Sequence, residues 1–406
     1  MYIKRHIEKV IKESEKTYPV TLITGPRQVG KSRVLKELYP KLNYETLDSP
    51  FLLSNIKDDP IGFLRLQGTP CIIDEIQKAP ELFTSIKYIV DNNKKDGMYF
   101  LTGSQKFPLM KGVSESLAGR ATILNMLGFS NREIYSDSFD LPFLPIEDYL
   151  LNRQTKINLS TSEIWQRIHK GSMPRLYENE SINWQRYYAD YVNTYLERDI
   201  HQLEQVGDTL SFLQFMTELA SRTGELLNMG SIAKDIGVSA PTIKRWISIL
   251  EKSNIIFSLQ PFSLNVNKRV IKTPKVYFTD TGLVCYLCKW TNWQVLQSGA
   301  MAGQIYETFV ISEILKSYYN AGLEPSMYFF RDTNGAEVDI LLYQNNTLYP
   351  IEVKKTTNPN LKDIKHFKTL AEAFPTTQIG EGGVICSCDK LYSLGENNKI
   401  IPLSYI

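Results

Sequence analysis

The feature that most constrains this chain is the run Gly25-Pro26-Arg27-Gln28-Val29-Gly30-Lys31-Ser32, which fits the pattern G-x-x-x-x-G-K-[ST]. An apolar stretch at 20–23 precedes the run and predicts a buried strand, and residues 33–38 predict the first turns of a helix. Strand, glycine loop and helix in this order form a phosphate-binding loop, because backbone N–H groups wrap the phosphates at a helix N-terminus. The residues expected to bind nucleotide here are Gly25, Pro26, Arg27, Gln28, Val29, Gly30, Lys31, Ser32 and Arg33.

Four polar side chains have specific predicted roles around this loop. Lys31 should reach the β- and γ-phosphates, and the Ser32 hydroxyl should ligate Mg²⁺. A second apolar strand, at 71–73, ends in two adjacent acids. Asp74 is expected to hold the Mg²⁺ shell, and Glu75 is expected to polarise the attacking water. The cofactors predicted for this part of the chain are therefore ATP and Mg²⁺.

Two further strands extend this pattern. A strand–helix unit at 42–48 suits an additional strand between the loop strand and the acidic strand. A third apolar strand, at 98–101, runs into Ser104, which could sense the γ-phosphate or serve simple turn and cap chemistry. Arg120 is the candidate arginine finger, with a structural arginine as the alternative.

Composition predicts a globular chain without a dominant charge. Its 406 residues leave room for two to four domains, and 43% hydrophobic with 22% charged residues is ordinary for such proteins. A net charge of +2 means that any DNA-binding surface must be local. No segment approaches the length of a membrane span, and the N-terminus lacks a signal-peptide pattern, so we expect a cytoplasmic protein with no membrane partner.

The five cysteines do not form a disulfide framework. Two close pairs exist, Cys285 with Cys288 and Cys386 with Cys388. Together they could build a four-thiolate zinc or iron–sulfur site. Their apolar, helical and strand-like surroundings favour buried free thiols instead.

The chain divides into four predicted parts. An opening helix over 1–18 precedes the nucleotide-binding sheet, and a segment rich in Ser, Asp, Pro and Asn follows that sheet at 136–160. The predicted fold class is α/β multidomain. Its parts are an AAA+ P-loop parallel sheet at 1–135, a helical connecting region at 136–225, a winged helix-turn-helix region at 226–295 and a restriction-endonuclease-like α/β domain at 296–406.

The helix-turn-helix signal rests on a short helix at 231–236, a turn at Gly237, a cap at Ser239 and a second helix at 241–250. A strand at 255–259 makes a winged variant. The second helix would enter a DNA major groove, or the unit would serve as a packing module. Its basic residues are Lys244, Arg245 and Lys252, followed by the basic run 267–269.

The last part holds a second set of reactive side chains. Glu307 lies on a predicted amphipathic helix, and strands at 336–342 and 348–354 flank a turn. A hairpin would place Asp339 beside Glu352, two carboxylates suited to a second Mg²⁺ or to Mn²⁺. The predicted catalytic residues are Glu307, Asp339, Glu352 and Lys354, with Asp339 and Glu352 as metal ligands and Glu337 as a substitute ligand. This is the PD-(D/E)xK nuclease pattern; the alternative is a cluster of surface salt bridges.

With these motifs in hand, the chain resembles the prokaryotic AAA-type ATP-binding proteins whose phosphate loop reads G-P-R-Q-V-G-K-[ST] and whose C-terminal half is a domain of unknown function with a restriction-endonuclease-like end. The resemblance covers nearly the whole chain. Besides the loop and the acidic strand, it rests on 101–104, 117–120, 195–199, 277–283, 337–339 and 351–354. Lys170-Gly171-Ser172-Met173-Pro174 departs from the Gly-Gly-x-Pro run that is usual there. The resemblance implies ATP binding and hydrolysis by an AAA+ core, a winged helix and a nuclease-like domain.

Two functional hypotheses follow. In the first, an ATPase is coupled to DNA binding or processing through the C-terminal domain. In the second, a nucleotide-dependent signalling or assembly switch acts on protein partners, with that domain as a non-catalytic platform. Either hypothesis allows assembly into a homo-oligomer.

Overall fold

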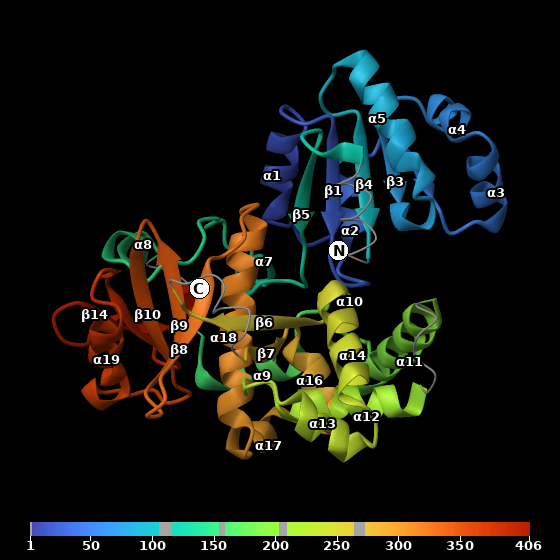
Figure 1. The fold of residues 1–406 in the computed structure, drawn as a ribbon. Coiled ribbons are helices and arrows are strands. Elements are labelled where there is room, and N and C mark those ends of the chain that lie inside the picture. Colours follow the sequence, from blue (N-terminus) through green and yellow to red (C-terminus); the bar gives the residue numbers. More distant parts are fainter. Residues whose placement is uncertain (1, 105–115, 154–158, 203–208, 264–272) are drawn as a thin grey trace.

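The computed structural model describes residues 2–104, 116–153, 159–202, 209–263 and 273–406. Figure 1 shows its two β-sheets in different parts of the molecule, with the long helix α18 (Ala302–Asn320) beside the second sheet. The basic run at 267–269 lies outside the described residues.

The first sheet has five strands, and every strand pair in it is parallel, in the order β2-β3-β4-β1-β5. Its strands are apolar and buried at the centre because helices cover the sheet, as parallel sheets require. The predicted place of the extra strand is wrong: β4 separates β1 from β3, and β2 forms the edge. The strands are β1 (Val20–Thr24), β2 (Asn43–Thr46), β3 (Cys71–Asp74), β4 (Tyr99–Gly103) and β5 (Ala121–Asn125).

The helices around this sheet are short. The opening helix α1 covers fewer residues than the sequence predicts, because Ile3 to Arg5 have no helical hydrogen bonds and the buried Arg5 side chain turns into the protein. The helices are α1 (Ile7–Ser14), α2 (Lys31–Leu38), α3 (Pro50–Asp58), α4 (Pro60–Gln67) and α5 (Glu81–Asn93), with a 3-10 turn at Ile76–Lys78.

A helical region follows, and it contains the predicted helix-turn-helix arrangement. Gly237 ends α13 in the left-handed conformation, with φ of 80°, and the Ser239 side chain accepts from the Thr242 N–H to cap α14. The helices are α7 (Asn131–Ile134), α8 (Glu147–Asn152), α9 (Thr161–Lys170), α10 (Arg175–Glu178), α11 (Trp184–Gln202), α12 (Thr209–Ser221), α13 (Met229–Ile236), α14 (Ala240–Lys252), α16 (Thr281–Leu287) and α17 (Trp293–Ser298).

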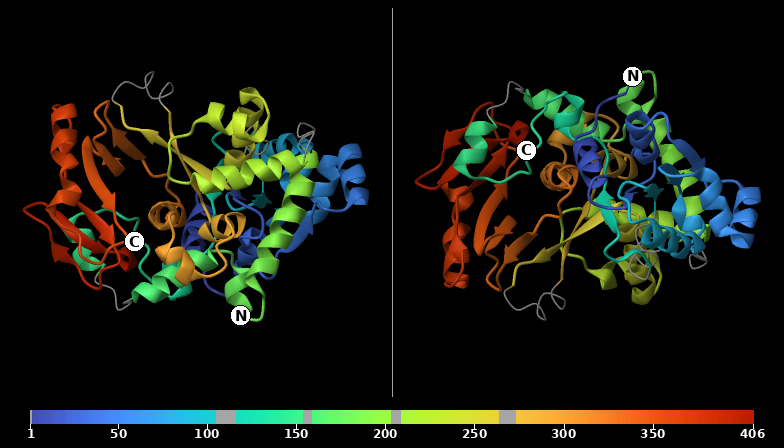
Figure 2. Two further views of the ribbon diagram at one scale, coloured as in Figure 1. Left: turned by 90° about the horizontal axis from the view of Figure 1, so that it is seen from below. Right: turned by 90° about the horizontal axis from the view of Figure 1, so that it is seen from above.

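The second sheet is mixed and has nine strands, ordered β13-β14-β12-β10-β9-β8-β6-β7, with β11 paired to β10. Helix α18 packs against β7 and β10, and Figure 2 shows it between this sheet and the helical region. The strands are β6 (Ile256–Pro261), β7 (Lys275–Phe278), β8 (Met327–Arg331), β9 (Glu337–Gln344), β10 (Thr347–Val353), β11 (Gln378–Ile379), β12 (Gly382–Cys386), β13 (Tyr392–Ser393) and β14 (Asn398–Pro402). Helix α19 (His366–Ala373) and 3-10 turns at Leu361–Ile364 and Leu403–Tyr405 complete this part.

Strand β6 joins two of the predicted parts. Its first half pairs antiparallel with β7, and its last residues pair parallel with β8, at Gln260 with Tyr328 and Pro261 with Phe329. Main-chain hydrogen bonds therefore cross the boundary predicted at 295/296, and β6 and β7 form one continuous sheet with the C-terminal strands.

Residues 131–153 form a strap that packs onto residues 404–406. Arg132 Nε donates to the Ile406 carbonyl oxygen at 2.9 Å. The Tyr149 hydroxyl donates to the Tyr405 carbonyl oxygen at 2.9 Å, and Arg153 donates to that of Ser404 at 2.9 Å. These buried bonds tie the segment after the first sheet to the far end of the second sheet.

Candidate functional site

The loop after β1 requires glycine at two positions. Gly25 has φ of 155°, and a Cβ built there would lie 1.9 Å from the carbonyl oxygen of Met126. Gly30 has φ of 92° and is the N-cap of α2, where a left-handed conformation favours glycine. The loop therefore presents backbone N–H groups at the N-terminus of α2, as phosphate binding requires.

A cavity of about 410 Å³ opens at this loop. Lys31 is buried, and its Nζ donates to the carbonyl oxygens of Gly25 at 3.0 Å and Pro26 at 2.7 Å. The ammonium group is thus held against the loop that is expected to bind phosphate. The cavity is lined by Arg27, Gln28, Gly30, Lys31, Ser32, Arg33 and Glu75, together with Tyr191 and Thr194 of α11.

Helix α11 also touches the loop directly. The Tyr187 hydroxyl donates to Gln28 Oε1 at 2.9 Å, and the next residue, Tyr188, donates to Asp280 Oδ1 at 2.7 Å. Asp280 in turn accepts from the Ser172 N–H at 2.6 Å. Ser172 belongs to the run that departs from Gly-Gly-x-Pro, and Asp280 is its hydrogen-bond partner. The nucleotide cavity is therefore built by two of the predicted parts.

Asp74 lies at the end of β3, where parallel strands place their carboxyl ends at one edge of the sheet. Its Oδ2 accepts from Ser32 Oγ at 2.8 Å and from the Tyr44 hydroxyl at 2.6 Å, and its Oδ1 accepts from the Thr102 hydroxyl. A serine oxygen and a carboxylate in contact are hard ligands of the kind that Mg²⁺ prefers. The predicted Mg²⁺ residues Ser32 and Asp74 thus lie together.

Glu75 follows with a backbone that few residues adopt. It has φ of 58° and ψ of 43°, the left-handed conformation that few non-glycine residues adopt. Its carboxylate accepts from Ser104 Oγ at 3.2 Å and from the Gln77 amide, and it lines the cavity. The two predicted residues Glu75 and Ser104 thus lie in contact with each other.

Arg120 does not reach this cavity. It precedes β5, and its carbonyl oxygen accepts from the N–H of Val20, the first residue of β1. Five strand residues, roughly 13 Å, separate this end of the sheet from the loop. The guanidinium instead binds the Asp91 carboxylate at the surface. Arg120 therefore contacts no phosphate bound by its own chain.

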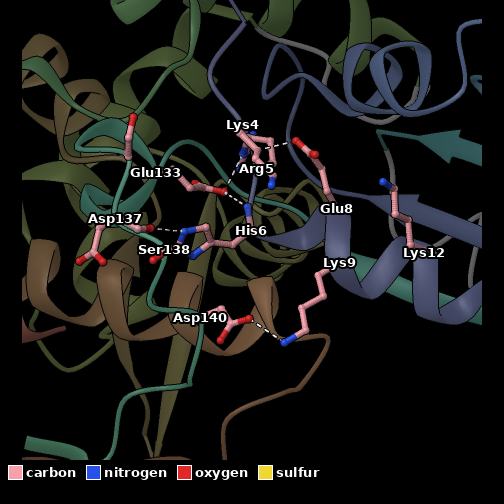
Figure 3. A pocket seen from close by; sticks show the side chains of 11 residues that line it. Lys4, Arg5, His6, Glu8, Lys9, Lys12, Glu133, Asp137, Ser138 and Asp140 are labelled. Atoms are coloured by element: carbon pink, nitrogen blue, oxygen red, sulfur yellow. Dashed lines mark hydrogen bonds and ion pairs between the residues drawn. The ribbon is translucent and has the colours of Figure 1, made fainter. Parts of the chain in front are cut away.

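A buried arginine, Arg5, also contacts the loop. Arg5 donates to the carbonyl oxygens of Val29 at 2.9 Å and Leu127 at 2.8 Å, and it forms an ion pair with Glu133 at 2.8 Å. Figure 3 shows Arg5 and His6 beside Glu133 at a separate cavity of about 440 Å³. Burial alone would raise the pKa of Glu133, but the adjacent Arg5 guanidinium holds it below its ordinary value.

The predicted hairpin is present, and it places Asp339 and Glu352 opposite each other. Strands β9 and β10 pair antiparallel with Ile340 against Ile351. The neighbouring residues Asp339 and Glu352 therefore face each other. Asp339 Oδ2 accepts from the Val353 N–H at 2.9 Å, and Lys354 Nζ lies 3.4 Å from that oxygen and 2.7 Å from Glu352 Oε2. Glu352 is buried, because α18 packs on β10, so its carboxylate does not belong to a surface cluster.

A second lysine completes what we term the carboxylate cluster: Glu307, Glu337, Asp339 and Glu352 with Lys275 and Lys354. Lys275 Nζ lies 3.4 Å from Glu307 and 2.5 Å from Glu337, and the Tyr277 hydroxyl donates to Glu307 at 2.5 Å. Burial, then the Asp339 charge, raise the pKa of Glu307 to about 7 and that of Glu352 to about 9. Burial disfavours the charge on Lys275, yet the neighbouring carboxylates raise its pKa.

The cluster differs from a ready metal site. Each of its four carboxylates has a lysine nitrogen within 3.4 Å. Within the described ranges, no three or more His, Cys, Asp or Glu side chains are grouped so that they could hold a metal ion. The five cysteines are free thiols, and four of them are buried.

Sequence reasoning located the loop, the acidic strand and the hairpin, but it missed several residues of both sites. The residues that contact predicted site residues but were not themselves predicted are Arg5, Tyr44, Tyr187, Lys275 and Tyr277. The alternation in β7, with Lys275 and Tyr277 two residues apart, is a signal that could have placed both on one face.

The fold and this loop define an α/β P-loop nucleotide-binding domain with a mixed sheet in the C-terminal part. Comparison with known families agrees: residues 17–135 match the model of an AAA domain. This part of the chain is thus similar to an AAA domain. Residues 161–294 and 302–406 match two domains of unknown function, DUF8612 and DUF4143.

Relatives and solved structures extend this comparison. Uncharacterized proteins of Mycobacterium bovis and Mycobacterium tuberculosis are each 25% identical over 393 residues, which cover 96% of this chain and 81% of theirs. A Walker-type ATPase of Pyrococcus abyssi aligns with TM-score 0.43 and 16% identity, covering 70% of this chain and 96% of its own. The RuvB Holliday junction branch migration motor of Thermotoga maritima aligns with TM-score 0.29 and 16% identity, covering 62% of this chain and 88% of its own.

No helix among the described residues is long and apolar enough to cross a membrane.

Proposed function

We propose that this protein binds Mg²⁺–ATP at the loop of residues 25–32 and hydrolyses it. The observation that carries the proposal is the convergence of Lys31, Ser32 and Glu75 on one 410 Å³ cavity at the carboxyl edge of a parallel sheet, with Asp74 in contact with Ser32. The donor set fits the nucleotide: backbone N–H groups and an ammonium for phosphates, and hard oxygens for the cation.

Each residue has a distinct part in this proposal. Lys31 exchanges its loop carbonyls for the β- and γ-phosphate oxygens, and Ser32 and Asp74 orient the cation. Glu75, fixed by Ser104 and Gln77, orients the attacking water. Mg²⁺, when bound, would neutralise charge that develops on the phosphates.

Phosphate release by the purified chain with Mg²⁺ and ATP tests this proposal. We expect turnover in the wild type, loss of turnover in Lys31→Ala, and nucleotide binding without turnover in Glu75→Gln. Lys41→Ala changes an exposed lysine outside the cavity and serves as the matched control. Turnover in Lys31→Ala equal to that of the control would overturn the proposal.

The carboxylate cluster supports a second candidate function, metal-dependent DNA processing. The supporting observation is the cross-strand placement of Asp339 and Glu352 with Lys354 between them, the arrangement in which a lysine can orient a water beside a metal. Exposed Lys244 and Arg245 on α14 offer a local basic surface for DNA. Nucleolysis with Mg²⁺ or Mn²⁺, absent in Asp339→Ala, is the expected result.

The pairing of the cluster with two lysines supports the competing hypothesis, in which the C-terminal part is a non-catalytic platform for protein partners. Hydrolysis assays with single-stranded, duplex and branched DNA separate the two. Stimulation by one DNA form favours DNA processing, whereas indifference to all forms favours the switch. The position of Arg120 adds that, as an arginine finger, this residue would act on a neighbouring copy of the chain, within a homo-oligomer.

A further inference from the structure

The tyrosine Tyr44 touches the acid that is expected to organise the cation. Its hydroxyl lies 2.6 Å from Asp74 Oδ2, the same oxygen that accepts from Ser32 Oγ at 2.8 Å. Tyr44 stands on edge strand β2, whose register places it against Ile72, two residues before Asp74. The contact therefore comes from a strand that carries none of the predicted site residues.

A second contact holds the Tyr44 side chain in place. Lys36 Nζ, in the second turn of α2, lies 3.4 Å from the centre of the Tyr44 ring, a cation–π contact. With the ring fixed in this way, the hydroxyl serves Asp74 as a donor.

The opposite oxygen of Asp74 is held as well. Thr102, on central strand β4, donates its hydroxyl to Oδ1 and is fully buried. With Tyr44 on one side and Thr102 on the other, the carboxylate plane is fixed, and Ser32 keeps oxygen lone pairs for a cation while it donates to Asp74. Partners of this kind fix the orientation of metal-binding groups and typically contribute 10–100-fold to metal affinity.

We propose that Tyr44 is a positioning residue for Mg²⁺ at the nucleotide site and acts through Asp74. This inference rests on the proposed ATP site and deepens it. Tyr44 contributes to the linkage between cation and nucleotide, and it contributes little to nucleotide affinity in the absence of the cation.

The test is the affinity for a fluorescent ADP analogue, titrated with EDTA and with increasing Mg²⁺, for the wild type and Tyr44→Phe. We expect equal affinities in EDTA, which also shows that the variant is folded. In Tyr44→Phe the Mg²⁺ concentration that gives half of the cation effect should rise roughly 10-fold. At saturating Mg²⁺ the phosphate-release rate should recover most of its wild-type value.

Tyr39→Phe is the matched control. Tyr39 lies at the end of α2, the helix that carries Lys36, and its hydroxyl donates to Glu15, not to Asp74. Its Mg²⁺ titration should coincide with that of the wild type. A Tyr44→Phe titration that also coincides overturns the role of Tyr44. Failure of the wild type to bind nucleotide, or to respond to Mg²⁺, counts instead against the proposed ATP site.

Discussion

The nucleotide cavity and the carboxylate cluster surround their charged groups differently. At the cavity, the Lys31 ammonium donates to two carbonyl oxygens of its own loop, and the Asp74 carboxylate accepts from three hydroxyls. At the cluster, Lys275 and Lys354 each contact two carboxylates. Neutral oxygens and hydroxyls thus contact the charged groups of the first site, whereas the second site pairs opposite charges within the protein.

The largest expected effect separates the two sites by activity. Removing the Lys31 ammonium takes away a group that stabilises charge on the phosphates, so Lys31→Ala should lower phosphate release roughly 100-fold or more. Asp339→Ala should leave that rate within about 2-fold, because the cluster and the cavity share no contact among the described residues. Phosphate release by both variants measures this. A large loss in Asp339→Ala would show that the sites are coupled.

Next in size is the stability of the cluster itself. Lys275→Met keeps a long apolar side chain but removes the lysine that pairs with Glu307 and Glu337, and Glu337 keeps Arg331 at 3.6 Å. Breaking a buried ion pair costs about 3–5 kcal/mol. Urea unfolding should show a loss of this order, while exposed Lys234→Met should stay near the wild type. An unchanged midpoint for Lys275→Met would mean that its charge is not needed there.

The pH dependence of stability sharpens the same contrast. Glu307 and Glu352 have pKa values raised from 4.5 to about 7 and about 9, so the folded state binds their protons more tightly than the unfolded state. Their contribution is fully present below pH 4.5 and is lost as pH rises through these folded values. In EDTA, Glu352→Gln should remove the part of the decline that extends above pH 7. An unaltered stability profile for this variant would contradict the raised pKa.

The smallest expected effect concerns the contact between α11 and the loop. Tyr187→Phe removes one hydrogen bond to Gln28, worth about 0.5–1.5 kcal/mol, so ATP affinity should fall by no more than roughly 10-fold. Tyr188→Phe, one residue on, removes the bond to Asp280 and should lower the melting temperature with ATP affinity unchanged. Equal affinities in the wild type and Tyr187→Phe would show that the loop does not depend on α11.

The sequence predicted those parts of each site that lie close together along the chain. The loop, the acidic strand and the β9–β10 hairpin each carry their signal within about ten residues, as glycine spacing, apolar runs or a turn at Asn345 and Asn346. Lys275 meets Glu337 across 62 residues, and Tyr187 meets Gln28 across 159. No periodicity connects such positions, because tertiary packing sets those contacts. The predicted position of β2 in the sheet was wrong for the same reason, because tertiary packing also sets the order of the strands.

The strap of residues 131–153 has a consequence for how the protein is made. Tyr149 and the carbonyl of Tyr405 that it contacts are 256 positions apart, so a ribosome adding about 5–20 residues per second makes the second roughly 10–50 s after the first. Throughout that interval the Tyr149 hydroxyl lacks the carbonyl oxygen that it contacts in the folded chain, and so does the Arg132 side chain. A nascent chain that has completed its first sheet therefore cannot yet form the contacts that fix this strap.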